Sequence, residues 1–259
     1  FRRVLFRSAF GGSTDSASTE DGGTVEKKED ATYDTDIVIV GAGGAGMTAA
    51  IEAADAGKNV VIVESQPLVG GNSVLSTGGI NAAKTKYQDE NDFDEAEGVE
   101  KTLKSAAENY SDNEAITELA KTVKEQWNEY QSGGTGYFDS TELFELDTLI
   151  GGKGINDPEL VAALCENSSD AIDWLDSIGA EGHNVSSFGG ASVKRIHRPV
   201  GDDGKTTAVG AYIVPILESN LESRDNITLL LETTARKVLT DDSGAAVGIE
   251  AEGSTGETV

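Results

Sequence analysis

The segment from Asp36 to Gly46, with the sequence DIVIVGAGGAG, constrains this chain more than any other. Four β-branched residues at 37–40 predict a short strand covered on both faces, and residues 47–56 predict a helix of small residues. Between them, Gly41 permits a tight turn, Gly43 lets backbone approach a phosphate, and Gly46 lets the helix pack against the strand. The N-terminus of that helix favours an anion. The segment therefore predicts a βα unit that binds the pyrophosphate of a dinucleotide.

Three spaced glycines decide little by themselves, because a chain with 31 glycines among 259 residues contains such a match by chance roughly 0.4 times. The flanking sequence supplies the rest of the argument. Gly57 stands where the helix would end, and residues 59–63 predict a second buried strand. Glu64 follows this strand directly. A carboxylate there accepts hydrogen bonds from ribose hydroxyls and repels a 2′-phosphate, which disfavours an NADP-type ligand.

The charge balance limits the partners of the chain. With 46 acidic and 20 basic residues the net charge is −26, which argues against nucleic acid and anionic membranes as partners. No apolar run reaches the ~18 residues of a membrane span. Cys165 is the one cysteine, so an intrachain disulfide is excluded, and it is interpreted as a small buried hydrophobe. His183 lacks a neighbour at metal-ligand spacing, and no metal site is predicted.

The rest of the sequence divides into a tail and one α/β domain. Residues 1–33 offer little to bury and predict a disordered tail or linker, and residues 34–259 form the domain. A helical insertion is expected at about 86–138, where residues 111–114 read as a capping box. Its apolar stripe consists of Ile116, Leu119, Ala120, Val123 and Trp127.

The second half alternates a helix, a loop and strands. One helix is expected from Pro158 to Gly179, and a glycine- and serine-rich loop after it. The buried stripe of that helix is predicted to be Leu160, Val161, Leu164, Ala171, Ile172 and Leu175. Residues 227–231 predict a third parallel strand, and residues 236–239 and 246–251 predict a β-hairpin around Asp241.

Several dispersed stretches resemble one known family. Residues 64–83 (ESQPLVGGNSVLSTGGINAA), 151–161 (GGKGINDPELV), 171–180 (AIDWLDSIGA) and 188–199 (FGGASVKRIHRP) are similar to the FAD-binding subunits of the fumarate reductase and succinate dehydrogenase family. The soluble flavocytochrome-type fumarate reductases and their urocanate-reducing relatives match best. The resemblance implies a Rossmann-like FAD-binding domain with a parallel sheet, a β-hairpin that is part of a meander, and a C-terminus that stops before the family fold is complete.

The resemblance also implies which residues hold FAD. In the membrane-bound relatives a histidine is bonded covalently to the flavin, and Asn72 occupies that position here. An amide cannot form the histidyl bond, so the flavin is expected to be noncovalent. Tyr212 is a second departure, because the soluble reductases often have histidine there. The predicted cofactor-binding residues are Gly41, Gly43, Gly44, Ala45, Gly46, Glu64, Ser65, Gly70, Gly71, Asn72, Ser73, Thr77, Gly78, Gly79 and Ala235.

A cationic cluster at residues 194–198 stands out in this acidic chain. Arginine binds carboxylate or phosphate in a bidentate way, so Arg195, His197 and Arg198 are predicted to face the flavin or an anionic substrate. Ordinary surface salt bridging is the alternative.

The activity implied by the resemblance is hydride transfer from flavin N5 to the C=C bond of fumarate or a similar unsaturated carboxylate, with electrons from a donor that the sequence does not identify. The catalytic residues are expected beyond Val259. The alternatives are reduction of urocanate or another acrylate, and a ketosteroid dehydrogenase-like reaction. The chain as it stands is expected to be a flavin-binding fragment without turnover of its own.

Overall fold

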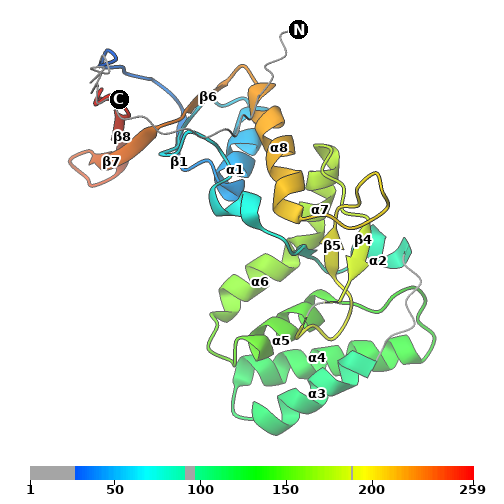
Figure 1. The fold of residues 1–259 in the computed structure, drawn as a ribbon. Coiled ribbons are helices and arrows are strands. Elements are labelled where there is room, and N and C mark those ends of the chain that lie inside the picture. The colour runs from blue at the N-terminus through cyan, green and yellow to red at the C-terminus, as the bar shows by residue number, and fades with distance from the viewer. Residues whose placement is uncertain (1–26, 91–96, 188) are drawn as a thin grey trace, which may run out of the picture.

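The computed structural model describes residues 27–90, 97–187 and 189–259. A parallel sheet with two helices lies at one end, a group of helices lies at the other, and a small antiparallel sheet stands between them (Figure 1). None of the described helices is long and apolar enough to cross a membrane. Within the same ranges, no group of three or more histidine, cysteine or acidic side chains is arranged to hold a metal ion.

The parallel sheet has the order β1-β2-β6 and consists of β1 (Ile37–Val40), β2 (Val60–Val63) and β6 (Ile227–Leu230). Ile37 pairs with Val60, and Val60 pairs with Ile227, so the three strands start in register. Two helices, α1 (Gly44–Asp55) and α8 (Val209–Glu222), pack on one face. The buried residues of this core are Ala42, Met47, Ala50, Ile51, Val60, Ile62, Val69, Val214, Leu217 and Leu221. The predicted strands and the helix between them are confirmed.

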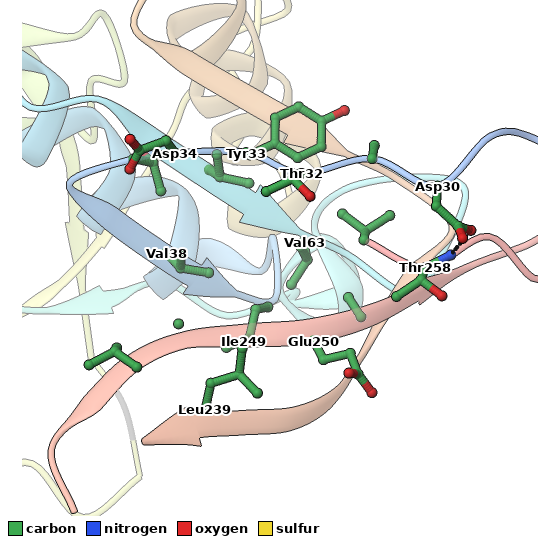
Figure 2. Close-up of a pocket in the computed structure, with 17 residues that line it drawn as sticks. Asp30, Thr32, Tyr33, Asp34, Val38, Val63, Leu239, Ile249, Glu250 and Thr258 are labelled. Atoms are coloured by element: carbon green, nitrogen blue, oxygen red, sulfur yellow. Dashed lines mark hydrogen bonds between the residues drawn. The ribbon is translucent and has the colours of Figure 1, made fainter. Parts of the chain in front are cut away.

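The opposite face of the sheet corrects one prediction. Strand β2 is buried along its whole length, whereas Val38 and Val40 of β1 are 36% and 61% exposed. The expectation that β1 is covered on both faces is therefore wrong. On this side a hollow separates the sheet from the hairpin, and both Val38 of β1 and Val63 of β2 line it (Figure 2).

That hairpin consists of β7 (Thr233–Thr240) and β8 (Ala246–Gly253), with Ala235 opposite Ala251. Asp241 fixes the turn, because its Oδ1 accepts hydrogen bonds from the N–H groups of Ser243 and Ala245. The hairpin prediction is confirmed. Residues 27–33 belong to the predicted tail, and within them Ala31 N–H donates to the carbonyl oxygen of Thr258 at 2.9 Å. Residues 1–26 lie outside the described part of the chain.

The helical group has a core of its own. It contains α3 (Glu97–Asn109), α4 (Glu114–Gln131), α5 (Thr141–Gly151) and α6 (Pro158–Glu166). Two more helices, α2 (Lys86–Glu90) and α7 (Ser168–Ser177), lie outside this core and pack against the small antiparallel sheet. Ile116, Val123 and Trp127 are buried as the α4 stripe predicted, and Leu119 and Ala120 are partly buried. The buried residues of the cluster are Ala83, Val99, Ala106, Ile116, Val123, Trp127, Leu143, Phe144, Leu146, Leu149, Val161, Cys165 and Val193. Burial raises the pKa of the Cys165 thiol to about 12, consistent with an inert packed side chain.

Two details of these helices differ from the sequence predictions. The N-cap of α4 is Asn113, whose Oδ1 accepts from Ile116 N–H at 3.1 Å, so the capping box does not start at Ser111. The single helix expected from Pro158 to Gly179 is two helices separated at Asn167. Because the second helix changes direction there, one apolar stripe cannot run through both, and Leu160 and Leu164 are 71% and 58% exposed.

The small antiparallel sheet replaces part of the expected loop. It has the order β3-β5-β4, formed by β3 (Ile80–Asn81), β4 (Asn184–Ser186) and β5 (Ile196–Arg198). Ile80 pairs with His197, which is distant in sequence. The cationic cluster therefore ends on a strand and not in a loop, and this part of the prediction was wrong. Strands of two or three residues are too short to show a period.

Candidate functional site: a phosphate turn beside a buried arginine network

The turn after β1 has the geometry that the three glycines predicted. Gly41 has φ +97°, and its N–H donates to the carbonyl oxygen of Val63 at 2.8 Å. A Cβ on Gly46 would lie 2.0 Å from the carbonyl oxygen of Gly41, so only glycine permits this approach of α1 to the turn. A Cβ on Gly43 would meet nothing closer than Ser73 Oγ at 3.9 Å. The space in front of the α1 N-terminus is therefore open.

Glu64 holds the same turn from the end of β2. Its Oε2 accepts a hydrogen bond from Ala42 N–H at 2.8 Å, and its Oε1 accepts from Gln66 N–H at 2.8 Å and from Ser65 Oγ at 3.3 Å. Burial opposes ionisation of this carboxyl, but the N–H donors outweigh it and the pKa of Glu64 is lowered. The carboxylate is charged at neutral pH, and it fastens the turn and retains lone pairs for a ribose hydroxyl.

A second segment forms the other wall of the turn. Gly70 N–H donates to the Ala42 carbonyl oxygen at 2.8 Å, and Gly44 N–H donates to Ser73 Oγ at 3.1 Å. These contacts bring residues 70–73, at the start of the 3₁₀ helix η1 (Gly71–Leu75), against the start of α1. The predicted residues of the two segments therefore lie together.

Two of the glycines in this second segment serve packing. Gly70 has φ +98°, and a Cβ there would lie 2.8 Å from Val214 Cγ1. A Cβ on Gly79 would lie 2.4 Å from Ile196 Cγ2 and 2.9 Å from Arg198 Cγ. Gly78, in contrast, has no neighbour within 4 Å of a Cβ. The structure therefore explains Gly70 and Gly79 without a ligand.

An exposed strip leads from the turn toward β3. The predicted residues Gly71, Asn72, Thr77 and Gly78 are all exposed along it. Ala235 lies apart from this strip, at the root of the hairpin, where Thr233 N–H donates to the Glu64 carbonyl oxygen at 2.8 Å. The predicted residues thus run from the hairpin root, past the α1 N-terminus, to the small sheet.

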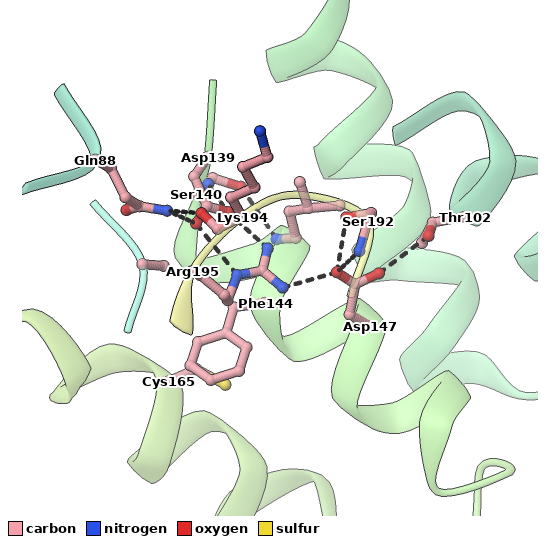
Figure 3. A network of polar contacts seen from close by, with 12 residues as sticks. Gln88, Thr102, Asp139, Ser140, Phe144, Asp147, Cys165, Ser192, Lys194 and Arg195 are labelled. Atoms are coloured by element: carbon pink, nitrogen blue, oxygen red, sulfur yellow. Dashed lines mark hydrogen bonds and ion pairs between the residues drawn. The ribbon is translucent and has the colours of Figure 1, made fainter. Parts of the chain in front are cut away.

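The three predicted residues of the cationic cluster lie in different environments. Arg195 is 1% exposed and lies between two aspartates (Figure 3). Its Nε and Nη2 donate to Asp139 at 3.2 and 2.7 Å, and its Nη1 donates to Asp147 Oδ2 at 2.7 Å. Burial works against the charge, but the two carboxylates raise the pKa of Arg195 above its usual value. The guanidinium also lies over the ring of Phe144, with 4.8 Å from Cζ to the ring centroid.

Neutral donors complete this network. Thr102 Oγ1, Ser192 N–H and Ser192 Oγ donate to Asp147, and Gln88 Nε2 donates to Asp139. The network therefore ties the loop before β5 to α2, α3 and α5. The single positive charge of Arg195 is met by two carboxylates within the network, which makes Arg195 a structural residue and leaves no free positive charge for a ligand.

His197 is also buried, and its polar contacts define its protonation. Its Nδ1 lies 3.2 Å from the Ile80 carbonyl oxygen and 3.0 Å from that of Arg195, so this nitrogen donates. Its Nε2 lies 2.7 Å from Thr85 Oγ1 and accepts from that hydroxyl. Burial lowers the pKa of His197, although the two carbonyl oxygens act in the opposite direction. The ring is neutral at neutral pH and adds no positive charge to the cluster.

Arg198 is the member of the cluster that differs from the other two. It stands on β5 beside Gly79 and is half-buried, and its buried Nε has no hydrogen-bond partner in the described chain. No carboxylate of the described residues pairs with it. A buried guanidinium nitrogen without a partner is costly, and the rest of the guanidinium carries an unpaired positive charge. His183, by contrast, is exposed and lies 2.6 Å from Glu181 Oε2.

A hollow of about 510 Å³ on the other face of the sheet does not suit the cofactor. It is lined by Val38, Val63 and Leu239 together with the carboxylates of Asp30, Asp34 and Glu250 (Figure 2). A pyrophosphate would be repelled by these three acids. The α1 N-terminus lies on the opposite side of the turn from this hollow, next to η1.

Asp139 and Asp147 were missed by the sequence analysis. Asp147 is a single acid among the buried residues Leu143, Leu146 and Leu149 of α5, and a lone acid on an apolar helix face is a signal for a buried partner. Asp139 carries no such signal. Asp139 and its partner Arg195 are far apart in the sequence, and only the fold brings them together.

Comparison with known proteins agrees with this geometry. The model of the FAD binding domain family matches residues 36–139 and 134–259. The chain belongs to this FAD-binding domain family. A fumarate reductase (cytochrome) of Shewanella frigidimarina is 38% identical over 224 residues, which is 86% of this chain and 31% of that protein. A urocanate reductase of Eggerthella lenta is 33% identical over 233 residues, or 89% of this chain and 30% of that protein.

Solved structures give the same result for this FAD-binding domain. The open conformation of a flavocytochrome c3 fumarate reductase superposes with a TM-score of 0.63 at 30% identity, covering 86% of this chain and 31% of that chain. A 3-ketosteroid-Δ4-(5α)-dehydrogenase from Rhodococcus jostii superposes with a TM-score of 0.58 at 21% identity, covering 92% and 45%, and shares the fold. The chain thus spans about a third of the length of the reductases it matches. The predicted family and fold class are confirmed.

Proposed function

We propose that this chain binds FAD noncovalently and forms the flavin-binding part of a reductase for the C=C bond of fumarate or a related unsaturated carboxylate. The observation that carries the proposal is the open α1 N-terminus at Gly43, fastened by Glu64 and walled by Ser73. This arrangement offers N–H donors and a dipole end to a pyrophosphate. Bound FAD would supply the hydride from N5 of its reduced ring.

The course of the flavin follows from the predicted residues. The adenosine ribose would lie at Glu64, with the hairpin root at Ala235 beside it, and the pyrophosphate at residues 43–46. The ring end would extend along the exposed strip of Asn72, Thr77 and Gly78 toward β5. Arg198 stands at the end of this strip, where the partly exposed guanidinium would contact the flavin or a substrate carboxylate.

Noncovalent binding is proposed because residue 72 is asparagine, whose amide is not nucleophilic enough to bond to the flavin. The test is to load the chain with FAD, denature it with heat or acid, and separate the precipitate. We expect all of the flavin in the supernatant. Yellow colour that stays on the precipitated protein would show a covalent bond and refute this part of the proposal.

The role of Arg198 is tested by Arg198→Ala. A lost hydrogen bond to a charged group costs about 1.5–3 kcal/mol, so FAD or dicarboxylate should bind roughly 10- to 150-fold more weakly. Arg236→Ala is the matched control, because Arg236 is an exposed arginine of the hairpin that pairs with Glu252 at 3.0 Å. A surface pair is worth about 0–1 kcal/mol, and its loss should leave binding unchanged. Equal behaviour of the two variants would remove Arg198 from the site.

Substrate choice is tested with a polypeptide that contains this chain and matches the reductases in length. We expect a reduced viologen dye to be oxidised when fumarate is added, and urocanate and acrylate serve as competing substrates. The 259-residue chain by itself is expected to hold FAD without turnover. Oxidation that depends on urocanate and not on fumarate would replace the proposed substrate and leave the FAD site intact.

A further inference from the structure

A groove between α3 and α4 lies outside the flavin site. Its volume is about 610 Å³. The floor is apolar and is formed by Leu103, Ala106, Ala107, Ala120 and Trp127. Small alanine side chains in a floor of this kind let another helix approach to the 8–10 Å at which helices pack.

The rim of this groove has a charge opposite to that of the chain. The two helices contain four lysines and seven glutamates. Three of the lysines, Lys104, Lys121 and Lys124, line the groove, whereas Glu100 is the one glutamate that does so. All three lysines are exposed, and among the described residues only Lys104 has an ion-pair partner, Glu108 at 3.8 Å. In a protein with a net charge of −26, this segregation makes the groove a local cationic surface.

The floor contains a polar group that requires a partner. Trp127 is 5% exposed, and its Nε1 has no hydrogen-bond partner in the described chain. A buried indole N–H usually has one. This nitrogen is itself buried, so the lysines of the rim, and not this group, indicate what the groove binds.

We propose that the α3–α4 groove is a docking site for an acidic amphipathic helix of a partner protein. Apolar side chains of that helix would cover the floor, and its acidic flanks would meet the three lysines. Helix α4 has 18 residues and is about 27 Å long, so a partner helix of similar length completes a three-helix arrangement. A second copy of this chain is disfavoured, because two lysine-rimmed grooves facing each other would repel.

The experiment uses two synthetic helices of about 20 residues, ~30 Å long, each with one leucine face. One has glutamate flanks and the other lysine flanks. Each fluorescently labelled peptide is titrated with the 259-residue chain, and binding is followed by anisotropy. A Trp174→Phe background leaves Trp127 as the single tryptophan, so a change in its emission locates the bound peptide.

We expect the glutamate peptide to bind, the lysine peptide to bind at least tenfold more weakly, and Trp127 emission to change only with the former. The triple variant Lys104→Glu, Lys121→Glu, Lys124→Glu should weaken the glutamate peptide at least tenfold. The triple variant Lys58→Glu, Lys205→Glu, Lys237→Glu has the same net charge at exposed positions elsewhere and should change affinity less than twofold. Lys121→Glu alone should change affinity in the same direction and serves as the test if the groove triple variant loses its helical circular dichroism.

Three results would overturn the proposal. The first is equal binding of the two peptides, and the second is equal loss of binding in the two triple variants. The third is a dimer in sedimentation that the groove variant dissociates, because the occupant would then be a second copy. None of these results depends on flavin, so they leave the proposed FAD site untouched.

Discussion

Substitution of Gly43 separates ligand binding from folding at the phosphate turn. Gly43 has φ −75° and ψ −179°, an extended conformation that valine adopts readily. A Cβ at this position would have Ser73 Oγ at 3.9 Å and the Gly70 carbonyl oxygen at 4.0 Å as its nearest neighbours. Gly43→Val should therefore fold with a free energy of unfolding within about 1 kcal/mol of the wild type, because less backbone freedom is lost on folding.

The same branched side chain would occupy the space where a phosphate meets the α1 N-terminus. Two charge-assisted hydrogen bonds at about 1.5–3 kcal/mol each would be lost, or ~3–6 kcal/mol together. The Kd for FAD should rise roughly 10²- to 10⁴-fold. The assay is a titration of FAD with apoprotein, followed by flavin fluorescence, beside thermal unfolding by circular dichroism.

Gly46→Val is the control that shows the opposite behaviour. Its Cβ would stand 2.0 Å from the Gly41 carbonyl oxygen, a backbone atom that cannot move without opening the turn. This variant should lose stability by several kcal/mol, in the upper range of single substitutions, whether or not FAD is present. The reasoning is refuted if Gly43→Val binds FAD with wild-type affinity, or if Gly46→Val folds as stably as Gly43→Val.

Two further predictions concern the buried cluster. Arg195→Leu leaves Asp139 and Asp147 buried without their cation, and the free energy of unfolding in urea should fall by about 3–5 kcal/mol; a loss below ~1 kcal/mol would mean that the network is dispensable. The lowered pKa of His197 means that this histidine takes up a proton more readily in the unfolded chain than in the folded one. The contribution of His197 to the free energy of unfolding is therefore intact above pH ~6.5 and falls as the pH drops below that value. His197→Gln should abolish that decline below about pH 6.5, whereas His183→Gln, the matched change at the exposed histidine, should retain it; identical pH profiles of the two variants would contradict the assignment.

The sequence predicts the elements whose pattern is local. The run of four β-branched residues, the glycines after it and Glu64 define the βαβ unit, because strand, turn and helix are consecutive there. The hairpin around Asp241 is equally local, since the residues that fix its turn stand within the turn. These predictions agree with the structure in strand pairing as well as in position.

The elements that the sequence does not predict depend on residues far apart. Strand β5 exists because β3 and β4 pair with it, and three residues have no period of their own. The glycine pairs show the same limit. Gly70 and Gly79 look like ligand glycines in sequence, yet Val214 and Ile196 explain them by contact. Only the folded chain separates a glycine that makes room for a ligand from one that makes room for a side chain.

The interpretation of the cationic cluster at residues 194–198 also depends on contacts that only the folded chain shows. Residues 194–198 contain three formal cations and a histidine, but Arg195 is neutralised by two aspartates and His197 is uncharged. At physiological salt, charges more than ~8 Å apart are largely screened, so acids farther than this from the turn do not strongly repel an anion that has reached it. Recognition of an anion must then come from groups in contact with it. These groups are the N–H groups at the start of α1 and the guanidinium of Arg198. The specificity of this site therefore depends on contact geometry and not on the electrostatic field of the whole chain.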